Sequence, residues 1–84
     1  MLPIHSLLSR IRWDPEFGRG EFALGYYDRV LDAIVRVSFA EIVLVPDRSD
    51  VIQVLSPDGD PHTVPLHRIK EVYKDGALIW QRLH

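Results

Sequence analysis

The side chains best suited to chemistry lie in one short turn, at His67 and Arg68, between two apolar segments. Residues 63–66 have the pattern of one strand and residues 69–72 that of the next, so a tight turn holds the two side chains next to each other. An imidazole donates or accepts a proton near neutral pH, and a guanidinium is a permanent cation with a planar fork of donors. Together they suit a phosphate or another compact anion.

A purely structural role would also explain these two residues. Arg68 could pair with an Asp or Glu on a neighbouring strand, and His67 could hydrogen-bond a carbonyl of the turn. The residues alone leave both interpretations open.

A second histidine, His62, lies five residues before His67 and raises the question of acid–base or metal chemistry. An odd spacing puts the two imidazoles on opposite faces of an unbroken strand, although a bend at Pro65 could realign them. If both reached one phosphate, they could act as an acid–base pair in a small phosphodiesterase. No metal is expected, because zinc needs three or four ligands and the chain offers no cysteine and no recurring His/Asp pattern. No cofactor is expected either, since the chain has no glycine-rich phosphate loop.

Two neighbouring tyrosines form a further candidate site. Tyr26 and Tyr27 follow each other on a predicted strand and therefore point to opposite faces of the sheet. We expect one to be buried and the other to be exposed beside Arg29, where stacking and a phosphate contact could be combined. The alternative is an ordinary strand end with a local Asp28–Arg29 turn.

A Trp-Asp-Pro cluster at residues 13–15 ends the predicted helix. Trp13 could offer its face to a base, but a core position is the favoured interpretation for both Trp13 and Trp80. Asp14 is expected to cap an amide of the following loop.

The elements that must position these residues follow from the spacing of the apolar side chains. A 3.6-residue period predicts an amphipathic helix over residues 2–13, which Pro15 ends. From residue 21 onward, β-branched and alternating residues predict strands, and Asp-Gly pairs at 58–59 and 75–76 predict hairpin turns. The expected strand segments are 21–27, 34–37, 42–45, 51–55, 62–66, 69–74 and 77–82.

Segments 34–42 and 61–69 repeat one pattern: strand residues, a small residue or proline, a large apolar residue, two turn residues and isoleucine. A duplication would explain the repeat, and so would two similar corners of a curled sheet. The expected fold is α+β, with one N-terminal helix packed on a curled, mainly antiparallel sheet of about six short strands. Bends at Ser38 and Pro65 can close such a sheet into a small barrel. With no linker, residues 1–84 form a single domain.

Composition narrows the classes of function. The chain has no cysteine, which fits a reducing cytoplasm, and it has no apolar run long enough to span a bilayer, so no membrane contact is expected. A net charge of −2 argues against coating of duplex nucleic acid, so any contact with nucleic acid should be local, at an end or a loop. A protein-interaction module that docks a partner on an exposed sheet edge is the alternative. The oligomeric state is left open.

The chain resembles the RNA cyclic-group-end recognition domain family from about Leu7 to Arg82. The resemblance rests on Trp13-Asp14-Pro15, Tyr26-Tyr27-Asp28-Arg29, Val64-Pro65-Leu66-His67-Arg68-Ile69, Asp75-Gly76 and Trp80. That family occurs alone or fused to RNA end-processing enzymes, such as 2'-5' RNA ligase-like phosphodiesterases and nucleotidyltransferases. The resemblance implies a small non-catalytic module for RNA repair or processing that recognises RNA 3' ends bearing a 2',3'-cyclic phosphate. It also implies an RNA end-processing enzyme as partner.

The residues that we expect to bind RNA or phosphate combine the family's motif positions with the tyrosine pair. Arg68 would fork onto the terminal phosphate and His67 would hydrogen-bond it, while Arg29 would contact the backbone and a tyrosine would stack on the terminal base. The full set is His67, Arg68, Arg29, Tyr27, Tyr26, Trp13 and Asp14.

Overall fold

The computed structural model describes residues 3–45, 47–48, 50–55 and 59–82, which form one α-helix and seven strands. In chain order the elements are α1 (Ile4–Trp13), β1 (Phe22–Asp28), β2 (Ala33–Ser38), the 3₁₀ turn η1 (Phe39–Glu41), β3 (Ile42–Leu44), β4 (Val51–Leu55), β5 (Pro61–Pro65), the 3₁₀ turn η2 (Leu66–Arg68), β6 (Ile69–Lys74) and β7 (Ala77–Gln81). The predicted α+β class and most of the predicted element bounds are confirmed. The hairpin turn predicted at 58–59 lies partly outside the described residues.

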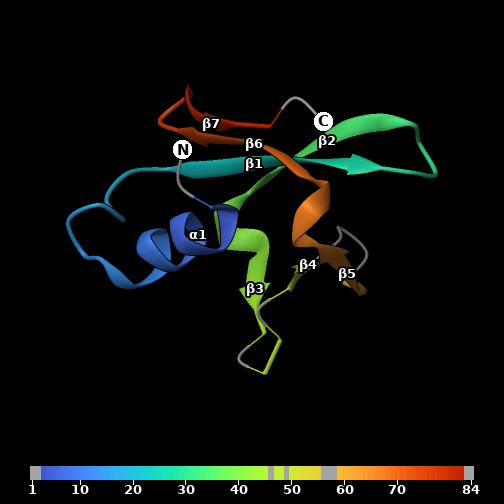
Figure 1. Cartoon of the computed structure of the whole chain (residues 1–84), viewed down its shortest axis with the longest axis horizontal. Coiled ribbons are helices and arrows are strands. Elements are labelled where there is room, and N and C mark those ends of the chain that lie inside the picture. Colours follow the sequence, from blue (N-terminus) through green and yellow to red (C-terminus); the bar gives the residue numbers. More distant parts are fainter. Residues whose placement is uncertain (1–2, 46, 49, 56–58, 83–84) are drawn as a thin grey trace.

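The strands form two antiparallel sheets instead of one curled sheet (Figure 1). One sheet has four strands in the order β2-β1-β6-β7, and the other has three in the order β3-β4-β5. The prediction of a single sheet of about six strands that closes toward a barrel is therefore wrong. The bends that were expected at Ser38 and Pro65 are present, but each one takes the chain out of one sheet and into the other. The hydrogen-bond ladder is interrupted at these positions, so it cannot continue into a barrel.

The two corners have almost the same backbone. Ser38, with φ −70° and ψ 141°, precedes η1, and Pro65, with φ −63° and ψ 142°, precedes η2. In each corner the following isoleucine, Ile42 or Ile69, donates its backbone N–H to the carbonyl of the first residue of the turn. The repeat found in the sequence therefore corresponds to two equivalent corners between the sheets. Its origin by duplication stays a prediction.

Helix α1 packs one face against the interior and turns the other to solvent. Its buried residues follow the 3.6-residue period and are Ile4, Leu7, Leu8 and Ile11. Trp13 follows Ile11 by two positions, about 200° around the helix, and its side chain is 77% exposed. The core position favoured for Trp13 is therefore wrong. The same prediction for Trp80 is confirmed, because Trp80 is 6% exposed on β7.

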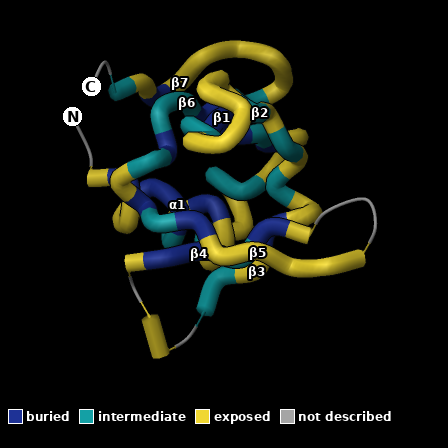
Figure 2. The backbone as a smooth tube through the Cα atoms, turned by 90° about the vertical axis from the view of Figure 1, so that its right-hand side faces the viewer, coloured by how far each residue is buried: buried dark blue, intermediate teal, exposed yellow. Residues whose placement is uncertain are grey.

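The core lies between the two sheets and is closed on one side by α1. Its most deeply buried side chains come from both sheets and are Leu24, Ile52, Ile69, Val54 and Val72. In Figure 2, buried stretches of α1, β4 and the four-stranded sheet face the interior, whereas the loop between β1 and β2 is exposed. No helix in the described ranges is long and apolar enough to cross a membrane.

Candidate functional site

A small hollow of about 170 Å³ brings together residues from three separate parts of the chain. Strand β1 and the turn after it contribute Tyr26, Tyr27 and Arg29, strand β5 contributes His62 and Thr63, and η2 contributes Arg68. We call this site the Arg68 hollow. It unites four of the seven residues that the sequence singled out, namely Tyr26, Tyr27, Arg29 and Arg68.

Arg68 reaches the hollow because η2 ends directly before β6, which pairs with β1. Tyr26 is the partner of Ile69 in that pairing, so the end of β1 lies next to the residue that follows Arg68. The Arg68 side chain is partly buried. Among the described residues, neither Arg68 nor Arg29 forms an ion pair with a carboxylate. The structural alternative for Arg68, a salt bridge to a neighbouring strand, is therefore not observed in the described part of the chain.

One carboxylate, that of Asp28, also lines the hollow. Its Oδ1 atom accepts hydrogen bonds from the backbone N–H groups of Val30, at 2.9 Å, and Leu31, at 3.2 Å. Asp28 thus shapes the turn that presents Arg29, as the local-turn interpretation predicted. Among the described residues, Asp28 forms no ion pair with Arg29 or Arg68, so both guanidinium groups keep their donors available for a ligand.

The two tyrosines occupy opposite sides of β1, as alternation along a strand predicts. Tyr26 is buried, and burial together with the charge of Asp28 raises its pKa. Tyr27 is half-buried and donates a hydrogen bond from its hydroxyl to the carboxylate of Asp32. That hydrogen bond is the main reason why the pKa of Tyr27 is raised. Both side chains are therefore neutral phenols near neutral pH, and Tyr27 is the more accessible of the two.

Histidines 62 and 67 are not brought together. His62 lines the Arg68 hollow, whereas His67 is exposed on η2 and is absent from the described residues that line it. The acid–base hypothesis required both imidazoles at one phosphate, and this arrangement supplies one. His62 and Thr63 enter the site because they lie on β5 directly before the corner, a placement that follows from the sheet topology and not from a local motif.

His67 lies instead at a cluster of cations that the sequence analysis missed. Its backbone carbonyl accepts hydrogen bonds from Arg82 Nη1, at 3.1 Å, and from Lys70 Nζ, at 3.5 Å. The Arg82 guanidinium also lies 5.2 Å from the ring centre of Trp80, and its backbone N–H donates to the carbonyl of Lys70. We call His67, Lys70 and Arg82 the His67 corner. Neither Lys70 nor Arg82 pairs with a carboxylate among the described residues.

The place of Lys70 in this cluster could not be predicted from the sequence, because it depends on an irregularity in strand pairing. The pairing of β1 with β6 shifts between Gly25, opposite Glu71, and Tyr26, opposite Ile69, which leaves Lys70 as the extra residue. An extra residue of this kind re-aims the neighbouring side chains. Arg82 is fifteen residues from His67 in the sequence, so only the pairing of β6 with β7 brings it close.

The remaining two predicted site residues lie elsewhere. The Oδ1 atom of Asp14 accepts hydrogen bonds from the backbone N–H groups of Glu16, at 3.0 Å, and Phe17, at 3.1 Å. These two bonds lower the pKa of the Asp14 carboxyl, and the bond from Phe17 has the larger effect. The predicted capping role is therefore confirmed. Trp13 lines a separate groove between α1 and the three-stranded sheet. RNA binding by Asp14 and Trp13 stays a prediction.

Comparison with known proteins agrees with the resemblance seen in the sequence. No curated protein and no solved structure matches the chain significantly. A family model described as the MJ1316 RNA cyclic group end recognition domain matches residues 1–82, nearly the whole chain. The chain therefore belongs to the MJ1316 RNA cyclic group end recognition domain family.

Proposed function

We propose that this chain is a non-catalytic module that binds RNA 3' ends carrying a 2',3'-cyclic phosphate, with the terminal phosphate in the Arg68 hollow. The observation that supports this most directly is the meeting of Arg29 and Arg68 in one small hollow, with no ion-pair partner among the described residues. The family name points to the same class of ligand. A guanidinium fork recognises two oxygens of one phosphate at once.

The size and lining of the hollow suit a phosphate group better than a whole nucleotide. At about 170 Å³ it lies below the range of roughly 300–1,000 Å³ that is usual for drug-sized ligands. A cyclic phosphate has a single negative charge and two free oxygens, which match the fork of Arg68. Arg29, His62 and Thr63 add further polar groups around the same space. Tyr27 lies at the half-exposed edge, where the terminal base could stack.

The His67 corner provides a second contact for the same strand. Lys70 and Arg82 each use a donor on the His67 carbonyl, and both side chains have further donors available, because an ammonium has three and a guanidinium five. We assign this corner to a backbone phosphate upstream of the end. The module then makes two or three phosphate contacts, which accords with a chain whose net charge is −2. Its binding should weaken with salt along a shallow slope.

The test is an NMR titration of isotope-labelled chain with short RNAs that differ only at the 3' end: 2',3'-cyclic phosphate, 3'-phosphate or hydroxyl. We expect the largest shifts at Arg29, His62 and Arg68, and the tightest binding for the cyclic end. Equal binding of all three ends would reduce the module to a general RNA binder. A complete lack of shifts with every RNA would overturn the proposal.

We further propose that the module works in RNA repair or processing beside an RNA end-processing enzyme. The support is the turn between β1 and β2, where Val30 is 92% and Leu31 is 65% exposed next to the hollow. An apolar turn beside a bound RNA end could touch an enzyme that acts on that end. Native mass spectrometry of the chain with a 2',3'-cyclic phosphodiesterase, with and without Leu31→Ser, tests this idea. If the parent chain and the Leu31→Ser variant bind the enzyme equally well, the turn is excluded as the contact.

A further inference from the structure

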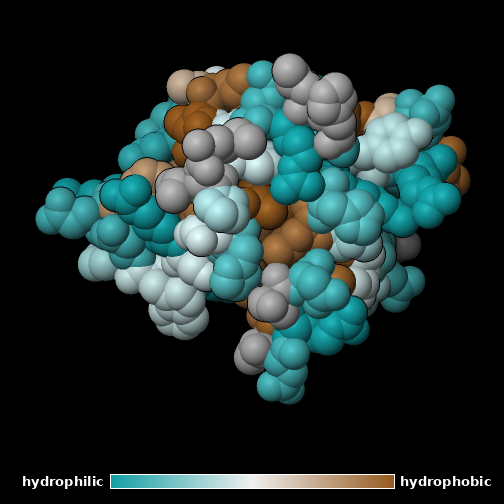
Figure 3. All heavy atoms as spheres, viewed as in Figure 1, coloured by the Kyte–Doolittle hydropathy of each residue, from teal (hydrophilic) through white to brown (hydrophobic). Residues whose placement is uncertain are grey.

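A second recess, separate from the Arg68 hollow, runs between α1 and the three-stranded sheet. It measures about 230 Å³. Its floor is apolar and is made of Leu8, Leu44, Ile52 and Leu66. In Figure 3, hydrophobic residues gather in the middle of this face of the molecule, between hydrophilic residues on either side. We call this recess the α1 groove.

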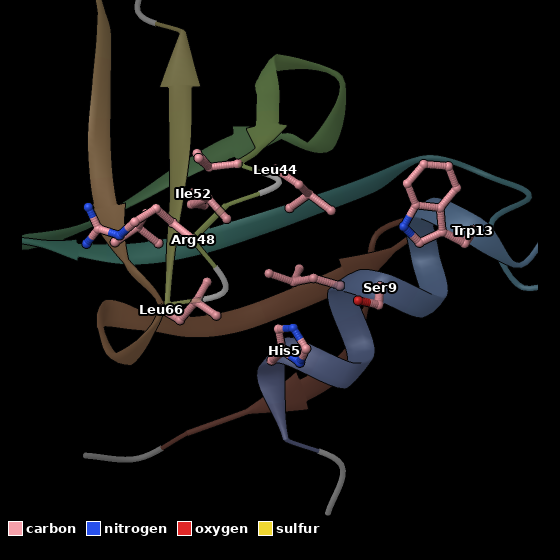
Figure 4. A pocket seen from close by; sticks show the side chains of 10 residues that line it. His5, Ser9, Trp13, Leu44, Arg48, Ile52 and Leu66 are labelled. Carbon is pink, nitrogen blue, oxygen red and sulfur yellow. The ribbon is translucent and has the colours of Figure 1, made fainter.

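Polar side chains border the α1 groove. His5 and Ser9 lie along α1, Trp13 lies at one end, and Arg48 lies toward the other end (Figure 4). The charge of Arg48 is already compensated, because its Nε and Nη2 atoms lie 3.2 Å and 3.4 Å from the two carboxylate oxygens of Asp50. Arg48 is the one Lys or Arg among the described lining residues, so the groove is poorly suited to a phosphate.

Trp13 has the largest aromatic side chain among the described residues that line this groove. Its indole is 77% exposed, and among the described residues no aromatic ring or cation stacks on it. A large aromatic side chain gains stability when it is buried, so a ligand that covers this indole would bind favourably. An apolar floor, a free aromatic face and a rim of hydrogen-bonding groups together match a planar heterocycle with polar edges.

We propose that the α1 groove is a subsite for one nucleobase of the bound RNA, upstream of its 3' end, and that Trp13 is its stacking face. This inference rests on the proposed function and extends it from the terminal phosphate to the strand that leads to it. The groove lies below the usual size of a drug-sized ligand pocket, which fits a single base.

One chain segment connects the two sites. Val64 and Arg68 line the Arg68 hollow, whereas Leu66, between them, lines the α1 groove. The corner at Pro65 therefore forms a wall with one site on each side. Five residues cover at most about 14 Å from the first Cα to the last, so a short oligonucleotide can reach both sites. A base held in the groove would set the direction in which the strand leaves the hollow.

The two tryptophans make a direct test possible. Acrylamide should quench mainly Trp13, since Trp80 is 6% exposed. A tetranucleotide with a 2',3'-cyclic phosphate should protect Trp13 from quenching, and 2',3'-cyclic AMP, which has no upstream base, should not. Trp13→Ala should weaken binding of the tetranucleotide by about 5- to 150-fold and leave binding of 2',3'-cyclic AMP unchanged. Trp13→Phe should retain part of the affinity, and Leu78→Ala, an exposed position on β7 outside the groove, should change nothing.

The outcomes separate this inference from the function on which it rests. If the cyclic-ended tetranucleotide binds but neither protects Trp13 nor responds to Trp13→Ala, the base subsite is wrong and end recognition survives. If tetranucleotides protect Trp13 equally with cyclic and hydroxyl ends, and Arg68→Ala has no effect, the base subsite survives and end recognition is wrong. If no RNA binds or protects Trp13, the base subsite is overturned together with the function.

Discussion

Arg82 and His67 are joined across fifteen residues of sequence, because the Arg82 guanidinium donates a 3.1 Å hydrogen bond to the His67 backbone carbonyl. This contact holds the end of β7 against the turn that bears Arg68. A carbonyl is neutral, so Arg82 keeps its full charge at this turn. The turn is thus braced by two cations, Arg82 and Lys70, which both donate to the His67 carbonyl.

Removing the cations of the His67 corner should make RNA binding less dependent on salt concentration. Each lost phosphate contact to a single strand lowers the slope of log K against log salt by about 0.7. Because Arg82 and Lys70 are assigned to one backbone phosphate, we expect the double variant Arg82→Gln/Lys70→Gln to reduce the slope by about this amount, measured by fluorescence anisotropy between low and physiological salt. Arg19→Gln, in the loop before β1, is the matched control and should leave the slope unchanged.

Removing Arg68 should have a larger effect on affinity than removing any other cation. A charge-assisted hydrogen bond is worth about 1.5–3 kcal/mol, so Arg68→Ala should raise the Kd for a cyclic-ended RNA by about 10- to 150-fold. Arg68→Lys keeps the charge but loses the planar fork, so most of the loss should remain. Isothermal titration calorimetry measures both variants. An unchanged Kd in Arg68→Ala would remove this residue from the site.

The outer face of the four-stranded sheet contains a close approach that requires glycine. Arg36 on β2 and Glu71 on β6 are both paired with Gly25 on the strand between them, and their Nε and Oε1 atoms lie 3.2 Å apart. A Cβ atom at position 25 would lie 2.6 Å from Glu71 Oε1 and 2.9 Å from Ile34 Cγ2. We expect Gly25→Ala to lower the free energy of unfolding by about 1–3 kcal/mol in urea denaturation.

A double-mutant cycle shows whether the Glu71 side chain is the cause. Glu71→Ala removes the oxygen that the new methyl group would strike, so Gly25→Ala should cost less in that background. Ile34 still lies close, so part of the loss should persist. Equal costs in both backgrounds would show that Glu71 moves aside freely.

The Asp14 carboxylate makes the free energy of unfolding depend on pH in the acidic range. Backbone hydrogen bonds from Phe17 and Glu16 hold the pKa of its carboxyl below the ordinary value of 3.8. A lowered folded-state pKa means that the contribution to stability is complete above the unfolded-state pKa and disappears as the pH falls through the folded one. The difference in urea midpoint between the parent chain and Asp14→Ala should therefore be larger at pH 7 than at pH 2. A difference that is constant with pH would contradict the role of the charged form.

The local elements could be predicted from the sequence because the signals that define them are local. The apolar period gave α1, the Asp-Gly pair at 75–76 gave the turn between β6 and β7, and the repeat gave two corners. The prediction for Trp13 failed because a tryptophan was expected in the core by type, although its position around the helix points away from Ile11.

The composition of the site was harder to predict than its elements. Arg29 and Arg68 could be singled out by type, but the sequence does not say that β5 adds His62 and Thr63 to the same hollow. That depends on the order of strands in two sheets, which no local pattern contains. Arg82 was missed for the same reason. Turns were expected at both corners, but they were expected to curl one sheet, whereas the 3₁₀ turns that form there divide the strands between two sheets.

The two corners also make residues 42–65 an insertion within the four-stranded sheet, whose strands come from the chain before and after it. Pairing β1 with β6 joins Phe22 to Lys74, so the chain must close a long loop before the central pair of that sheet can form. Strands β3, β4 and β5 pair only with their neighbours in sequence, which is the faster kind of contact to make. We expect the pairings between sequence neighbours to form first, and those of β3, β4 and β5 shorten the loop that β1 and β6 must close. The turn that bears Arg68 would then reach its final position only when β6 docks on β1, so the phosphate site would be among the last parts of the chain to be assembled.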